Sequence, residues 1–165
     1  MDKTILVAVV SAISAVIGVF ISQVSVLLKE HLNKKHLKQI LLREKYEELA
    51  DCIQAAMVAS NQVADSSSIS ELMKFGINEP LRKAMSLSLI YFPEFKDAVG
   101  AFQNAYISHY DVMAKSYHRE VNETVGTQAV FHNRKAYVET AERLILTRHE
   151  IDLLVEKYAH KYAKA

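Results

Sequence analysis

Glycine, proline and cysteine are scarce in this chain of 165 residues: it has four glycines, two prolines, one cysteine and no tryptophan. So few turn-forming residues argue against a fold of many short strands and favour long helices. The single cysteine, Cys52, excludes an internal disulfide and suits a reducing compartment. The net charge of +1 lacks the basic excess typical of nucleic-acid-binding proteins, so we expect no nucleic-acid partner.

Motifs for cofactors and metals are also missing. The glycines form no phosphate-binding loop, there is no C-x-x-C pair, and the seven histidines include no H-x-x-x-H pair. We therefore predict that the histidines lie scattered on helix surfaces and that Cys52 is a buried structural thiol. The sequence predicts no metal, no cofactor and no enzymatic activity.

One catalytic pattern is present near the C-terminus. The stretch RLILTRH places Arg143 six residues before His149. On a helix, this pair resembles the R-x(4–6)-H motif of HEPN ribonucleases, in which the arginine and histidine act on the scissile phosphate of RNA, usually at a dimer interface. The resemblance covers seven residues, and Leu144 stands where that family usually has a polar residue. It implies Arg143 and His149 as candidate catalytic residues.

A long apolar run opens the chain. Residues 4–28, TILVAVVSAISAVIGVFISQVSVLL, contain no charged side chain. In a helix these 25 residues span roughly 37 Å, more than the ~30 Å hydrocarbon core of a bilayer. A cleaved signal peptide has a shorter apolar run, and a buried helix of this length should show a polar face. We therefore predict a transmembrane anchor over 1–28.

A basic segment follows the apolar run. Residues 29–45 contain six Lys and Arg against two Glu. Such residues beside a span favour the cytoplasmic side, which predicts an inner- or plasma-membrane protein with its N-terminus outside and its C-terminal domain in the cytoplasm. We expect contacts with lipid headgroups from Lys29, Lys34, Lys35 and Lys38. A plain solvated helix is the alternative for this segment.

Small residues recur at spacings of three and four within the apolar run. In lipid, helices associate through close backbone approach and short polar contacts, so a seam of small residues predicts a homo-oligomer. The seam consists of Ala8, Ser11, Ala15, Gly18, Ser22 and Ser25.

Helical patterns continue to the end of the chain. The first helix should run to about Ala64, because its apolar positions recur at spacings of four and three until the DSSS stretch. We then predict a short helix, a second short helix that stops at Pro93 and is the most buried element, and two long helices separated near Gly126. The expected fold is all-α: a transmembrane helix that continues into a cytoplasmic antiparallel bundle over 46–165, with three long and two short helices in all.

Two features of the bundle have alternative interpretations. Arg148 falls on an apolar seam between Leu144 and Ile151, which predicts either an interhelix or intersubunit ion pair or a side chain that reaches out at the seam edge. The suggested carboxylate partners are Glu44, Glu47 and Glu48. The tyrosine stripes indicate core packing, with a partner-binding groove as the alternative.

Three functional hypotheses follow. The first is a membrane-anchored assembly or adaptor protein that self-associates and recruits a cytoplasmic protein partner. The second is a membrane-disrupting effector, of the bacterial defence or toxin type, whose spans form a pore. The third is the HEPN-like ribonuclease. For the second hypothesis the polar path would consist of Ser11, Ser14, Ser22, Gln23 and Ser25.

Overall fold

The computed structural model describes the backbone of residues 3–120 and 134–162, with the side chains of residues 14, 16–117 and 134–162. The described residues form helices joined by short turns, with no strand among them, which confirms the all-α prediction. The chain divides into two units, Met1–Leu41 and Leu42–Ala165.

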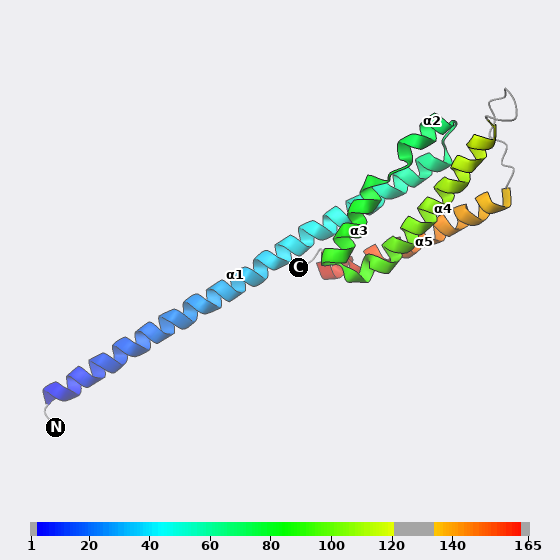
Figure 1. Ribbon diagram of the computed structural model, residues 1–165. Helices are drawn as coiled ribbons and strands as arrows, with labels where there is room; N and C mark the ends of the chain where they lie inside the picture. Colours follow the sequence, from blue (N-terminus) through cyan, green and yellow to red (C-terminus); the bar gives the residue numbers. More distant parts are fainter. Residues whose placement is uncertain (1–2, 121–133, 163–165) are drawn as a thin grey trace. The chain divides into compact units, whose positions relative to one another are not determined.

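The first unit is the N-terminal part of helix α1, which extends over Lys3–Ala64. Figure 1 shows this segment as a continuous helix without a kink at the boundary between the apolar and basic stretches. From residue 16 to residue 41 every described side chain is exposed except that of Gln39, which is half-buried. The described side chains of this segment therefore form no hydrophobic core within the first unit.

The predicted membrane anchor is corrected by the structure. Among the described residues, no helix has both the length and the apolar character that crossing a membrane requires. This finding contradicts the predicted transmembrane anchor over 1–28. The predicted single-pass membrane localisation, with the N-terminus outside, is wrong for the same reason.

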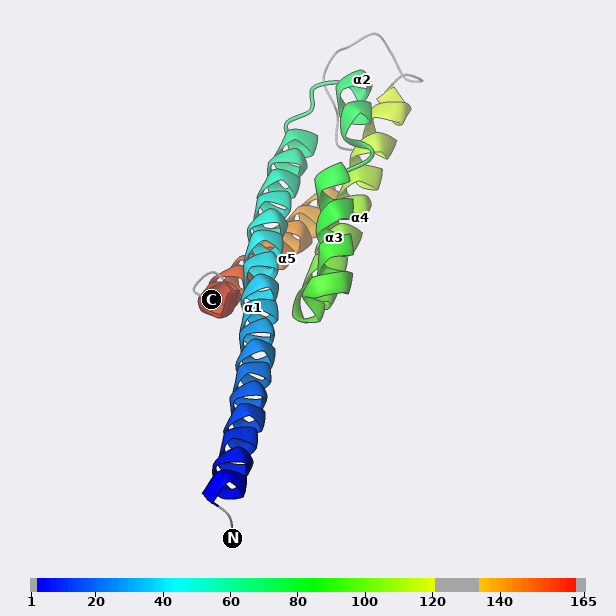
Figure 2. The same ribbon diagram turned by 90° about the vertical axis from the view of Figure 1, so that its left-hand side faces the viewer.

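The second unit is a helical bundle. It contains the last part of α1 and the elements α2 (Ile69–Leu72), η1 (Met73–Phe75), α3 (Glu79–Tyr91), η2 (Pro93–Phe95), α4 (Lys96–Glu120) and α5 (Arg134–Tyr162). Helices α4 and α5 pack against each other and run in opposite directions, and α3 lies along α4 (Figures 1 and 2). Three long and two short α-helices among the described residues match the prediction.

Local side-chain chemistry sets the short helices. Ser68 Oγ accepts a hydrogen bond from the Glu71 backbone N–H at 3.2 Å and so caps α2. Asn78 Oδ1 accepts from the Leu81 N–H at 3.1 Å and caps α3. The long helix predicted from Pro93 instead begins at Lys96, because residues 93–95 form a 3₁₀ turn.

The core follows the seams that the sequence predicts. On α1 the buried positions include Tyr46, Leu49, Ile53, Ala56, Ser60 and Val63, together with Cys52 and Met57. On η2 and α4 they include Phe95, Val99, Phe102, Tyr106, Met113 and Tyr117. Helix α3, predicted to be the most buried element, buries only one face, and Leu89 and Ile90 on its other face are 54% and 70% exposed.

Aromatic rings close one end of the bundle. The ring centroid of Phe92 lies 4.9 Å from that of Tyr162 and 5.7 Å from that of Tyr46. Tyr46 stacks on Tyr162 at 5.3 Å, and its hydroxyl donates a hydrogen bond to the backbone carbonyl of Val155. The end of α5 is thereby attached to α1 and to the turn after α3.

Candidate functional site

The first unit carries an exposed apolar surface. Its exposed large apolar side chains are Val16, Ile17, Val19, Phe20, Ile21, Val24, Val26, Leu27, Leu28, Leu32, Leu37, Ile40 and Leu41. Isolated apolar side chains on a protein surface are ordinary, but a contiguous stretch of this extent marks an interaction site. A lone helix has no other means of removing these groups from water.

The predicted small-residue seam lies on this surface. Of its six members, Gly18, Ser22 and Ser25 have described side chains and are exposed, whereas those of Ala8, Ser11 and Ala15 lie outside the description. A Cβ atom added at Gly18 would meet nothing within 4 Å. Ser25 Oγ donates to the Ile21 backbone oxygen at 2.8 Å, which satisfies the hydroxyl inside the helix. The described seam is therefore a flat, sterically open strip.

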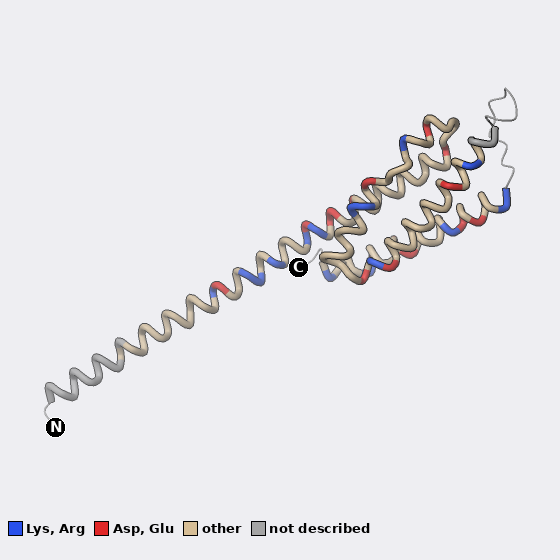
Figure 3. Tube along the Cα trace, viewed as in Figure 1, with Lys and Arg blue, Asp and Glu red and all other residues tan. Residues whose placement is uncertain are grey.

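Basic side chains follow the apolar stretch on α1 (Figure 3). Lys29, Lys34, Lys35 and Lys38 are all exposed, and none has a hydrogen bond or ion pair with another described residue. The lipid-headgroup contacts predicted for these lysines stay a prediction. Their charge remains available to an acidic partner.

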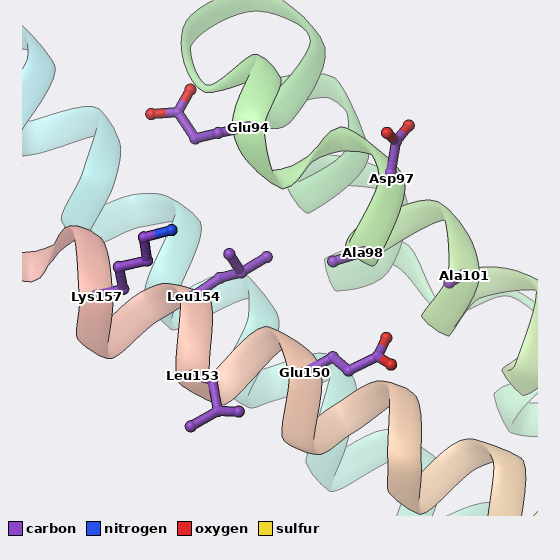
Figure 4. Close-up of a pocket in the computed structure, with 8 residues that line it drawn as sticks. All are labelled: Glu94, Asp97, Ala98, Ala101, Glu150, Leu153, Leu154 and Lys157. Carbon is purple, nitrogen blue, oxygen red and sulfur yellow. The ribbon is translucent and has the colours of Figure 1, made fainter.

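A groove of about 600 Å³ lies between α4 and α5 in the second unit (Figure 4). Its apolar lining comes from Ala98, Ala101, Leu153 and Leu154. Carboxylates line both sides, with Asp97 on α4 and Glu150 on α5, while Glu94 and Lys157 lie at the same end of the groove on different elements. The groove is thus apolar at its base and acidic along its edges, which suits a partner with apolar and basic side chains.

The carboxylate of Glu94 is already engaged at that end. Tyr162 Oη donates to its Oε1 atom at 2.5 Å, and Lys161 Nζ donates to the same atom at 3.1 Å. Burial opposes the charge of Glu94, but these hydrogen bonds outweigh it and keep the pKa of the carboxyl below its ordinary value. The unengaged negative charge of the groove therefore belongs to Asp97 and Glu150.

Arg148 does not pair with the carboxylates suggested for it. Its Nη1 atom donates to Asn61 Oδ1 on α1 at 3.4 Å, and the side chain is half-buried. Glu48 instead accepts from Lys45 Nζ at 2.6 Å and Lys83 Nζ at 2.7 Å, hydrogen bonds that lower its pKa to about 2. Glu47 pairs with Arg43. An intersubunit pair for Arg148 stays a prediction.

The catalytic candidates are not brought together. Arg143 and His149 are both exposed on α5, and no hydrogen bond joins them. At about 100° per residue, six positions place the two side chains roughly 120° apart around the helix. No observation favours the ribonuclease hypothesis. Among the described residues no three His, Cys, Asp or Glu side chains gather to hold a metal ion.

Cys52 and His109 are buried titratable side chains of the second unit. Cys52 is buried as predicted, and burial raises the pKa of its thiol, which disfavours the reactive thiolate. His109 was expected on a helix surface, but its side chain is only 1% exposed. Its Nδ1 atom lies 3.1 Å from Thr140 Oγ1 on α5, and its ring packs on that of Tyr137. The apolar neighbours of His109 on α4, Ala105 and Met113, were the available sequence signal.

Comparison of the chain with protein-family models, curated proteins and solved structures finds no match.

Proposed function

We propose that this protein is a self-associating helical adaptor. In this proposal residues 14–41 of α1 join copies of the chain, and the bundle of the second unit presents a surface to a protein partner. The observation that carries the proposal is the exposure of every large apolar side chain from Val16 to Leu41. A helical surface of this kind serves to bind other helices.

The energetic scale supports association. Thirteen large apolar side chains are exposed on this segment. Burying a Val, Leu, Ile or Phe side chain gains about 1.5–3 kcal/mol, so burying half of them gains on the order of 10 kcal/mol per copy. The cost of joining two molecules is about 4–15 kcal/mol. Two copies that share this surface therefore gain enough to overcome that cost.

The small-residue strip indicates how the copies meet. Helix backbones approach most closely where Gly and Ser replace bulky side chains, and Gly18, Ser22 and Ser25 provide such a strip on one face. Apart from the adjoining helix backbone, no described atom lies within 4 Å of a Cβ added at Gly18, so a larger side chain there is expected to disturb contacts with another molecule.

Sedimentation of the full chain tests the proposal. We expect a defined oligomer for the wild type and a smaller species or monomer for Gly18→Ile, because the new side chain separates the helices. Val16→Phe is the matched control: it adds the same number of heavy atoms on roughly the opposite face of α1 and should leave the oligomer intact. Repeating the measurement in a mild non-ionic detergent separates ordered association from colloidal aggregation.

A wild-type monomer at all concentrations would reject self-association. Loss of the oligomer in both variants would show that any added bulk is disruptive and would reject the seam as the specific contact. An unchanged Gly18→Ile oligomer would place the contact on another face of α1.

A further inference from the structure

We propose that the groove between α4 and α5 of one copy binds residues 29–41 of a second copy. The inference rests on the proposed self-association and adds a second contact to it, separate from the small-residue seam. The helix supplied by the second copy would lie along the groove with its apolar side chains on the base and its two lysines, which share one flank of the helix, against one acidic edge.

The groove has the form that a helix requires. Ala98 and Ala101 keep the α4 side shallow, so that a third helix can approach closely. Leu154 is half-buried between the two helices, and Leu153 is 52% exposed, which leaves apolar surface at the base and on the α5 side. A volume of about 600 Å³ exceeds what a single small side chain occupies and suits several side chains of a docked helix.

The segment 29–41 has the matching pattern. Lys34, Leu37, Lys38 and Leu41 are spaced at i, i+3, i+4 and i+7, which places them on one face of α1. Leu37 and Leu41 are 64% and 42% exposed, and both lysines are exposed. This face therefore combines two apolar anchors with two cations and one anion, Glu30, while the groove combines an apolar base with two unpaired anions and one cation, Lys157.

Charge selects this segment over the apolar run that precedes it. Asp97 and Glu150 are exposed on opposite edges of the groove and have no hydrogen bond or ion pair with another described residue. Lys34 and Lys38 are likewise unpaired among the described residues. Residues 14–28 carry no charge, so they match the base of the groove but not its edges.

A second copy is the simpler source of the segment. Helix α1 is continuous over Lys3–Ala64, and its part from Leu42 onward belongs to the bundle. The proposed self-association already supplies the segment from a second molecule, with α1 unbroken in both copies.

Disulfide trapping between two different full-length chains tests the contact. In a Cys52→Ala background, one chain carries Leu37→Cys and the other Leu153→Cys. We expect their mixture to form a disulfide-linked heterodimer several-fold more than the control in which Leu32→Cys replaces Leu37→Cys. Leu32 is the same residue type with almost the same exposure, 63% against 64%, but lies roughly 140° around the helix.

Charge reversal provides a second arm of the experiment. Lys34→Glu with Lys38→Glu on the first chain should reduce the heterodimer yield several-fold, and Asp97→Lys with Glu150→Lys on the second chain should restore it. The matched control, Lys29→Glu with Lys35→Glu, makes the same change in net charge away from the docking face and should reduce the yield less.

The outcomes separate this inference from the proposed function. Equal trapping of Leu37→Cys and Leu32→Cys, or no rescue by the reversed groove, would overturn the groove contact. If the chain still sediments as an oligomer, self-association stands. A disulfide that forms only when both cysteines are in one chain would show that the segment occupies its own groove and would also overturn the inference. A monomer without trapping would reject both proposals.

Discussion

At the scale of single residues, the buried His109 makes stability depend on pH. Burial lowers the pKa of its imidazole below the ordinary value of 6.5, so the folded protein keeps the ring neutral. As the pH falls below 6.5, the His109 imidazole becomes protonated in the unfolded chain but stays neutral in the folded protein. The free energy of unfolding should therefore decrease by up to about 1 kcal/mol between pH 7.5 and 5.5.

Urea unfolding at several pH values, with wild type beside His109→Gln, measures this contribution. Glutamine offers a side-chain donor for Thr140 but does not titrate, so the variant should show a flatter profile over this interval. Identical slopes for wild type and His109→Gln would show that other groups govern the pH dependence.

His109 also shows where sequence reasoning ends at this scale. Its place on the inner face of α4 can be read from the spacing to Ala105 and Met113, but its partner Thr140 lies 31 residues away on α5. Only the packing of α4 against α5 brings Thr140 Oγ1 within hydrogen-bond distance of the His109 ring. A buried polar ring needs such a partner, because burial without a hydrogen bond costs free energy. The same holds for Arg148, whose partner Asn61 is 87 residues away.

At the scale of elements, Asn78 joins a helix cap to a tertiary contact. Its Oδ1 atom caps α3, and its Nδ2 atom donates to the Ala56 backbone oxygen on α1 at 3.2 Å. Asn78→Ala removes both hydrogen bonds at a buried position and should destabilise the bundle by about 2 kcal/mol. Thermal or urea unfolding measures the change.

Ser68→Ala is the comparison for this prediction, because Ser68 caps α2 but is exposed, and its side chain has no hydrogen bond to another described helix. Ser68→Ala should lower the free energy of unfolding by about 0.5–1 kcal/mol, as for the loss of an exposed helix cap. Equal costs for the two variants would show that the bond from Asn78 to Ala56 contributes nothing beyond capping.

Elements were predictable where the signal is local. The end of α1 at Ala64, the caps at Ser68 and Asn78 and the core positions on α1 and α4 follow from spacing and from side chains a few residues apart. The burial of α3 was not predictable in this way. Its apolar content is high, but whether Leu89 and Ile90 are covered depends on which helices surround it, and α3 packs along α4 with one face only.

At the scale of the whole molecule, the division into two units locates the core. Every buried apolar side chain among the described residues belongs to the segment from Tyr46 onward, while the described side chains of residues 16–41 are exposed or half-buried. The boundary at Leu41 and Leu42 falls inside the basic segment predicted over 29–45. The site on α1 is therefore visible in the sequence as an apolar and basic pattern, but the groove that lies between α4 and α5 is not, because it exists only once they pack.

This division predicts that residues 42–165 fold without the first 41. The shortened chain keeps all the described core, so it should unfold cooperatively with a midpoint within about 5 °C of the full chain, as followed by circular dichroism. A further truncation to 51–165 removes the buried Tyr46 and Leu49 and should cost several kcal/mol. The 42–165 chain should also sediment as a monomer, since it lacks both the seam and the docking segment. If it folds but still associates, the bundle itself joins the copies, and the exposed face of α1 must serve a partner other than a second copy.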